Sequence, residues 1–279
     1  MLTATGPRAD SFVFASPGAP DVVVHACVPA RLGAGTRLAV VMHGRLRNAA
    51  DYIRAWGAWA ERTDHVVLAP RFDRASWPGA HGYNLGNVFS AADGSGRLLP
   101  TARWSFTVVE RLCAHARSAF GLGERPFALW GHSAGAQFVH RFLLLRPEAP
   151  VRSAIVAGAG WYTVPDRRVP FPYGLAHPRL AFSTHELGAY LRRPLTIMRG
   201  DLDTLADRDL RRTPGAEAQG RDRFERAAHF HRRALAADAR CAWRLVDVGD
   251  VGHDWERMAH AAQSVWEDDL SSSAVFVDA

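Results

Sequence analysis

The stretch LWGHSAGAQFVHRFLLL, residues 129–145, decides the fold. It begins as an apolar run, passes through Gly131-His-Ser133-Ala-Gly135, and continues with the spacing of a helix. A serine between two glycines at such a junction has two interpretations. It is a nucleophile held on a strained turn, or it lies in an ordinary turn of a chain that contains 24 glycines. The choice depends on what the rest of the sequence places beside it.

Strand and helix patterns alternate from residue 37 to the end of the chain. Strands are expected at 37–44, 65–72, 126–133, 151–160, 194–200 and 242–249, and helices at 49–63, 105–121, 134–145, 221–239 and 254–270. Such alternation predicts a doubly wound, mostly parallel sheet with helices on both faces. Two earlier β-rich runs, 11–16 and 21–29, are joined by the turn PGAP and predict an antiparallel edge.

One segment does not follow this alternation. Residues 161–190 come after the sixth expected strand and are rich in proline, arginine and aromatic residues. A long irregular insertion beyond a strand end is typical of a functional loop. We therefore expect a flap over a site, within a single domain of residues 1–279.

Composition and charge exclude several classes of protein. The chain is 48% hydrophobic and 22% charged, as in ordinary soluble proteins. The net charge is +6, but all 34 basic residues are arginines and most are interspersed with acids, which predicts a solvated surface rather than a nucleic-acid site. No metal cluster, phosphate loop or dinucleotide motif is visible, so we expect no metal and no cofactor.

The cysteines and apolar runs indicate the compartment. Cys27, Cys113 and Cys241 lie far apart and are odd in number, which predicts buried thiols in a reducing environment. No run of about 18 apolar residues predicts a membrane span. The first 16 residues lack the pattern of a secretory signal. We expect a cytoplasmic protein.

Three reactive residue types lie at expected strand ends. In open parallel sheets, ligands bind beyond the carboxyl ends of the strands. Ser133, Asp203 and His253 fall there in the order serine, acid, histidine. With a G-x-S-x-G turn between strand and helix, this order resembles the α/β-hydrolases over residues 37–268. Within that superfamily, the strand end MHG and the general layout resemble esterases related to polyhydroxybutyrate depolymerases.

The resemblance implies a role for each of these residues. Ser133 would be the nucleophile, and His253, in the turn DVGHDW, would accept its proton. The acid lies in RGDLDT, where Asp201 and Asp203 are both possible from position alone. The glycine-x-x-aspartate spacing that is usual in the superfamily, counted from Gly200, selects Asp203. Asp201 would then shape or cap the loop.

The resemblance also implies an oxyanion hole made of two backbone N–H groups. The amide of Ala134, which follows the nucleophile, should supply one of them. The amide of Arg45, in the loop after strand 37–44, should supply the other. The ring of His43 is expected to order that loop, and His132 beside the nucleophile is expected to pack against its neighbours.

Aromatic residues gather in loops and helix starts near the predicted site. We expect an apolar pocket suited to acyl groups, with four aromatic residues as candidate substrate contacts. These are Trp77, Trp104, Trp161 and Tyr162. Asn84 and Asn87, in the motif YNLGN, either hold the long loop or contact a substrate carbonyl.

The constellation predicts a serine hydrolase that cleaves carboxylic esters through an acyl-enzyme. A peptidase or amidase on the same fold is an alternative, in which Arg167 and Arg168 of the flap could bind a peptide terminus. An acyl transferase and a non-catalytic binding protein are two further alternatives. The intact set of serine, acid and histidine argues against a non-catalytic protein. Unlike extracellular depolymerases, this sequence shows no signal, no substrate-binding module and no paired cysteines. A soluble small or oligomeric ester is therefore the expected substrate.

Overall fold

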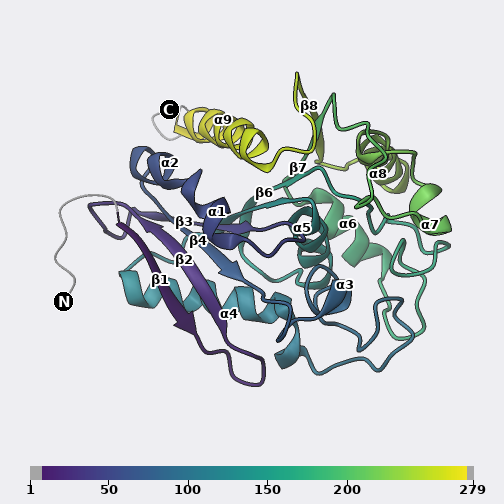
Figure 1. The fold of residues 1–279 in the computed structure, drawn as a ribbon, viewed down its shortest axis with the longest axis horizontal. Coiled ribbons are helices and arrows are strands. Elements are labelled where there is room, and N and C mark those ends of the chain that lie inside the picture. The colour runs from purple at the N-terminus through teal and green to yellow at the C-terminus, as the bar shows by residue number, and fades with distance from the viewer. Residues whose placement is uncertain (1–7, 275–279) are drawn as a thin grey trace.

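The apolar runs of the sequence form the strands of one sheet in the computed structural model, which describes residues 8–274 (Figure 1). The spatial order of the eight strands is β1-β2-β4-β3-β5-β6-β7-β8. The strands are β1 (Arg8–Phe14), β2 (Val22–Val28), β3 (Arg37–Met42), β4 (His65–Arg71), β5 (Phe127–His132), β6 (Val151–Ala157), β7 (Leu195–Gly200) and β8 (Arg244–Val248).

The sheet is mostly parallel with an antiparallel edge, as the alternation predicts. The pairs β1–β2 and β2–β4 are antiparallel, and the strands from β4 through β3 to β8 run parallel to one another. The expected fold class is therefore confirmed. The expected domain of residues 1–279 is described only in part, because residues 1–7 and 275–279 lie outside the described residues. The first seven of the 16 residues that lack a signal pattern are among them.

Both faces of the sheet are buried because alternate strand residues enter two different cores. In β3, Leu38, Val40 and Met42 join one core, whereas Ala39 and Val41 join the other. A central parallel strand covered on both faces is expected to be almost wholly apolar. This explains the uninterrupted apolar run of that strand.

Helices cover the two faces unequally (Figure 1). The larger core is covered by four helices, and the smaller core by three that include the closing helix. The four are α4 (Ser105–Phe120), α5 (Ala134–Leu145), α6 (Thr184–Arg192) and α8 (Arg223–Ala237), and the three are α1 (Ala49–Arg54), α2 (Gly57–Arg62) and α9 (Trp255–Ala274). Short turns form α3 (Gly79–Gly82), α7 (Pro214–Glu217) and the 3-10 helix η1 (Thr101–Arg103).

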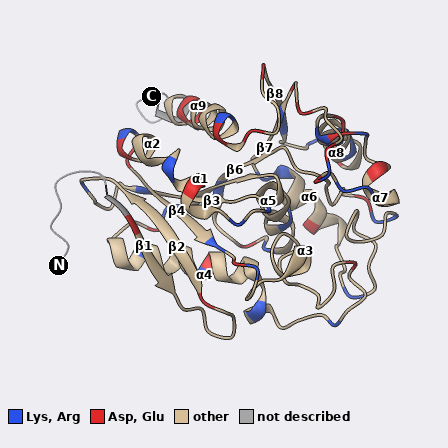
Figure 2. Ribbon diagram, viewed as in Figure 1, with Lys and Arg blue, Asp and Glu red and all other residues tan. Residues whose placement is uncertain are grey.

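Two global properties bear on the expected class of protein. Within residues 8–274, no helix is both long and apolar enough to cross a bilayer. Figure 2 shows arginines along most elements, interspersed with acidic residues. This is the pattern that the sequence predicts for a solvated surface.

The expected helix at 49–63 is two helices, α1 and α2. The N–H of Trp56 bonds to the carbonyl of Ile53, 3.0 Å away, a tighter turn than that of an α-helix. Gly57, a poor residue for a helix interior, begins α2. The turn sets Trp56 in the core, with its ring 5.4 Å from those of Trp130 and Trp266. Packing of large indoles overrides the helical pattern here.

The segment expected as a flap is only partly irregular. Its last residues begin α6, where Ser183 and Glu186 form a capping box: each side chain accepts a hydrogen bond from the other's backbone N–H. The hydroxyl of Tyr190 donates to the carbonyl of His140 on α5, at 3.2 Å. The end of the segment therefore packs on α5, and residues 161–183 form the irregular remainder.

Candidate active site

Ser133 lies on a strained turn between β5 and α5. Its backbone has φ 56° and ψ −114°, a region that residues other than glycine rarely adopt. A Cβ on Gly131 would lie 2.3 Å from the carbonyl oxygen of Gly135, and one on Gly135 would lie 2.0 Å from that of Met42. The two glycines are therefore required, because strand and helix approach too closely for a side chain.

The turns after β7 and β8 bring an acid and a histidine to this serine. The Nε2 atom of His253 lies 3.1 Å from Ser133 Oγ, and its Nδ1 atom lies 2.8 Å from Asp203 Oδ2. The Asp203 side chain is 3% exposed and that of His253 is 26% exposed, so the acid is shielded while the histidine reaches the cavity. A hydroxyl, an imidazole and a carboxylate in one hydrogen-bonded chain can generate a serine nucleophile.

The structure separates the two aspartates that the sequence left adjacent. Asp203 reaches His253, whereas Asp201 accepts a hydrogen bond from the N–H of Val251 at 3.3 Å. Asp201 thus ties the loop after β7 to the loop that carries the histidine. This is the loop-shaping position that was expected of it.

Arg223, which the sequence analysis did not identify, supports the acid. Its Nη1 atom lies 3.4 Å from Asp203 Oδ1, and its guanidinium also holds Asp207 at 2.9 and 3.1 Å. The hydrogen bond and charge of Arg223 lower the pKa of Asp207 to about 2. Arg223 follows Asp222, the N-cap of α8, and no motif marks it in the sequence.

A second histidine packs behind the first. The ring of His132 lies 4.6 Å from that of His253, centroid to centroid, and its Nδ1 atom is 3.2 Å from the Tyr52 hydroxyl. Burial holds the pKa of His132 well below its usual range, so the ring is neutral. A neutral ring at this distance adds no positive charge beside His253.

Two backbone amides beside the cavity are candidates for an oxyanion hole. Ala134 is the first residue of α5, whose opening N–H groups have no partner within the helix. In the part of the chain that the structure describes, the Arg45 N–H also donates to no protein group. Both residues line the same cavity as Ser133. They are therefore available as the two expected donors.

His43 orders the loop that carries Arg45, as expected. Its Nε2 atom accepts the N–H of Phe72 at 3.2 Å, and its Nδ1 atom lies 2.9 Å from the carbonyl oxygen of Gly44. The hydroxyl of Tyr83 donates to the carbonyl of His43 at 2.7 Å. Burial lowers the pKa of His43 to about 3, so its ring is neutral and holds the loop through these two hydrogen bonds.

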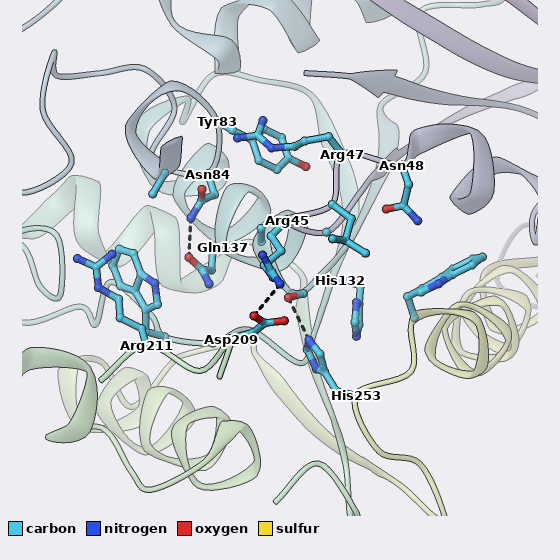
Figure 3. Close-up of a pocket in the computed structure, with 18 of the residues that line it drawn as sticks. Arg45, Arg47, Asn48, Tyr83, Asn84, His132, Gln137, Asp209, Arg211 and His253 are labelled. Carbon is cyan, nitrogen blue, oxygen red and sulfur yellow. Dashed lines mark hydrogen bonds and ion pairs between the residues drawn. The ribbon is translucent and has the colours of Figure 1, made fainter. Parts of the chain in front are cut away.

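A cavity of about 640 Å³ opens at Ser133 (Figure 3). Of the four aromatic residues expected to contact substrate, Trp161 lines it. Trp161 is only 3% exposed, and the guanidinium of Arg211 lies 4.9 Å from the centre of its ring. The wall around it is more polar than the expected apolar pocket, because Asn84, Gln137 and Arg211 line it as well.

The other three expected aromatic contacts lie away from the cavity. Trp77 is in the core, 5.0 Å from the ring of Phe72, and Tyr162 stacks on Phe230 at 4.4 Å. Trp104, at the start of α4, donates its indole N–H to the carbonyl of Leu99. Apolar burial turns the rings of Trp77 and Tyr162 inward, and Trp104 is partly buried against the same core.

The two asparagines of YNLGN have different roles. Asn87 donates to the carbonyl of Arg103 at 2.8 Å and so holds its own loop. Asn84 lines the cavity and donates to the side-chain oxygen of Gln137 at 2.6 Å, as drawn in Figure 3. Among residues 8–274, no group of three histidines, cysteines or acids could hold a metal ion.

Two solved structures are similar to this chain over almost its whole length. Poly(aspartic acid) hydrolase-1 from Sphingomonas sp. KT-1 is 35% identical, with a TM-score of 0.87, over 93% of this chain and 98% of that one. A poly(3-hydroxybutyrate) depolymerase from Bordetella parapertussis is 33% identical, with a TM-score of 0.86, over 94% and 91%.

More distant structures share the fold. A fluorophosphonate-binding serine hydrolase of Staphylococcus aureus is 13% identical, with a TM-score of 0.59, over 94% of this chain and 97% of that one. No protein-family model and no curated protein sequence matches the chain. The two closer similarities show what the resemblance implied: the chain is a serine hydrolase and belongs to the α/β-hydrolase family of the poly(3-hydroxybutyrate) depolymerase and the poly(aspartic acid) hydrolase.

Proposed function

We propose that the protein cleaves carboxylic esters through an acyl-enzyme formed on Ser133. The observation that carries this proposal is the hydrogen-bonded chain from Ser133 Oγ through His253 to Asp203, with distances of 3.1 and 2.8 Å. A serine hydroxyl is a weak nucleophile at neutral pH unless a base takes its proton during attack. We assign this role to His253 Nε2, 3.1 Å from the hydroxyl.

Acylation begins when Ser133 Oγ attacks the ester carbonyl carbon and His253 Nε2 takes the hydroxyl proton. The carbonyl π bond opens, and the resulting oxyanion is stabilised by the amides of Ala134 and Arg45, each contributing about 3 kcal/mol in the transition state. As the tetrahedral intermediate collapses, the bond to the alcohol oxygen breaks and His253 returns the proton to that oxygen. The alcohol leaves, and the acyl group remains on the serine.

Deacylation repeats these steps with water as the nucleophile. His253 removes a proton from water, the hydroxide adds to the acyl carbon, and the Ser133–acyl bond breaks with the proton returned to Oγ. Asp203 accepts the Nδ1–H throughout, which fixes the tautomer of His253 and stabilises its charged form. The products are a carboxylate and an alcohol.

An amide hydrolase is the second candidate. The favouring observation is the 35% identical relative, which is described as a hydrolase of poly(aspartic acid), a polymer whose backbone bonds are amides. The same catalytic groups would serve, since His253 could protonate a departing amine as it protonates an alcohol. The amide is the harder bond, so an ester of the same acyl group should react faster in either case.

A panel of 4-nitrophenyl esters of graded acyl length, with an aminoacyl anilide alongside, tests the proposal. The wild-type enzyme should hydrolyse the esters, and Ser133→Ala should lower kcat by at least about 10,000-fold while the variant stays folded. Hydrolysis of the anilide with no hydrolysis of any ester would replace the esterase proposal with an amidase. Ester turnover that survives Ser133→Ala would remove the serine mechanism altogether.

A further inference from the structure

The cavity at Ser133 has a strong excess of positive charge. Among the described residues that line it, five are arginines and one is an acid. These are Arg45, Arg47, Arg74, Arg211 and Arg223, with Asp209 as the acid. A cleft with one dominant sign of charge attracts ligands of the opposite sign.

Four of the five arginines are accounted for by their partners or by their exposure. Arg45 pairs with Asp209 at 2.6 Å, and Arg223 holds the two acids described above. Arg47 donates to three backbone carbonyls, of which the oxygen of Phe72 lies 2.6 Å away. Arg74 is exposed at the rim and donates to a carbonyl at 3.1 Å. Arg211 is the remaining arginine whose position in the cavity these contacts do not explain.

Arg211 is half-buried, and its guanidinium is held in place without an ion pair. Its Nε atom donates to the hydroxyl of Tyr173 at 2.6 Å, and its guanidinium lies 4.9 Å from the ring centre of Trp161. Within residues 8–274, its two terminal nitrogens make no hydrogen bond and no salt bridge. Figure 3 shows Arg211 and His253 on different sides of the cavity. A guanidinium that is held in place and has unpaired terminal N–H groups is suited to bind an anion.

A second cation lies behind the same indole. The guanidinium of Arg141 is 4.1 Å from the ring centre of Trp161, is fully buried and has no carboxylate partner among the residues that the structure describes. It donates to Thr163 Oγ1 at 2.8 Å and to the carbonyls of Asn84 and Gln137, and its Nη2 atom has no hydrogen-bond partner within residues 8–274. Burying an unpaired charge is costly, and an anion bound nearby would offset part of that cost.

We propose that Arg211 binds a carboxylate of the substrate, and that the enzyme acts on esters that carry a free carboxylate close to the scissile bond. This inference rests on the proposed ester hydrolysis at Ser133 and names its substrate class. Oligomers of hydroxy acids fit, because every such chain ends in a carboxylate and each hydrolysis creates another. Arg211 acts in substrate binding, and the bond-breaking steps remain with Ser133 and His253.

Two matched substrate pairs test the proposal without assuming on which side of the ester the carboxylate lies. For the acyl side, 4-nitrophenyl hydrogen adipate is compared with 4-nitrophenyl hexanoate. For the alcohol side, 4-acetoxybutanoate is compared with butyl acetate. Within each pair the carbon chains have equal length, so kcat/KM of the charged ester divided by that of the neutral ester isolates the carboxylate.

Arg211→Gln should lower this ratio roughly tenfold in at least one pair, through a higher KM for the charged ester, because one charge-assisted interaction is lost. Its kcat/KM for the neutral esters should stay within about twofold of wild type. Arg212→Gln is the matched control: the same change of net charge on the next residue, which is exposed and does not line the cavity, should leave the ratios unchanged.

Two results would overturn the inference. One is an unchanged ratio in both pairs. The other is an equal loss on charged and neutral esters, which would mean that Arg211 only supports Trp161 and Tyr173. Failure of the wild-type enzyme to hydrolyse any neutral or charged ester would instead reject the ester hydrolysis proposed at Ser133, so the two failures are distinguishable.

Discussion

Two parts of the cavity differ in how they are built. The strand-end frame, Ser133, Asp203 and His253, lies in turns that directly follow β5, β7 and β8. The arginine wall is made of Trp161 beyond β6, Arg211 between β7 and α8, and Arg223, the first residue of α8. Sheet topology fixes the place of the frame, because the carboxyl ends of parallel strands meet at one edge. The wall is fixed mainly by loop contacts, and it meets the frame where Arg223 contacts Asp203.

The largest expected effect comes from changing the acid of the frame. Asp203→Asn should lower kcat for esters by roughly four orders of magnitude, because an amide can donate to Nδ1 of His253 and favour the tautomer that cannot take the serine proton. Steady-state kinetics on a neutral 4-nitrophenyl ester measure this.

The neighbouring aspartate supplies the control. Asp201→Asn keeps an oxygen that can accept from the N–H of Val251, so kcat should stay within about threefold of wild type. If Asp201→Asn proves the more damaging change, Asp201 is the acid of the frame and the distinction drawn here between the two residues is wrong.

A smaller effect is expected where the wall meets the frame. Arg223→Gln removes a cation from Asp203 and Asp207, and kcat should fall roughly tenfold as the carboxylate of Asp203 loses a fixed partner. The melting temperature should also fall, because a buried acid is left without its partner charge. Arg221→Gln, an exposed change two residues earlier, should leave both quantities near wild type.

The pH dependence of that stability loss has a defined sign. Since Arg223 lowers the pKa of Asp207 from 3.8 to about 2, the pair stabilises the folded state above pH 3.8 and loses this contribution as the pH falls toward 2. The difference in unfolding free energy between wild type and Arg223→Gln should therefore be largest near neutral pH and shrink in acid. A difference that grows as the pH falls would show that Arg223 does not act through these carboxylates.

The sequence predicts the strands and the long helices well because their burial is periodic. Each expected strand appears in the sheet, shifted by at most a few residues. The failures are local. Tertiary packing of Trp56 splits one expected helix. The helix that starts after Ser183 was not predicted, although Ser183 and Glu186 have the spacing of a capping box.

The site residues also differ in how well the sequence predicts them. Ser133, Asp203 and His253 could be located because they occupy strand ends in a fixed order, and the structure brings them together. Arg211 and Arg223 could not, because their contacts depend on irregular loops, and neither periodicity nor spacing encodes which way an arginine points. Three of the four aromatic candidates fail for the same reason: proximity to the site in sequence does not tell whether a ring faces the cavity or the core.

The most direct test of the separation between frame and wall is the rate of labelling by an uncharged fluorophosphonate probe, with peptide mapping of the modified residue. We predict that the label lies on Ser133, that Ser133→Ala is not labelled, and that Arg211→Gln is labelled within about twofold of the wild-type rate. Labelling that persists in Ser133→Ala, or an Arg211→Gln variant as unreactive as Asp203→Asn, would contradict the account.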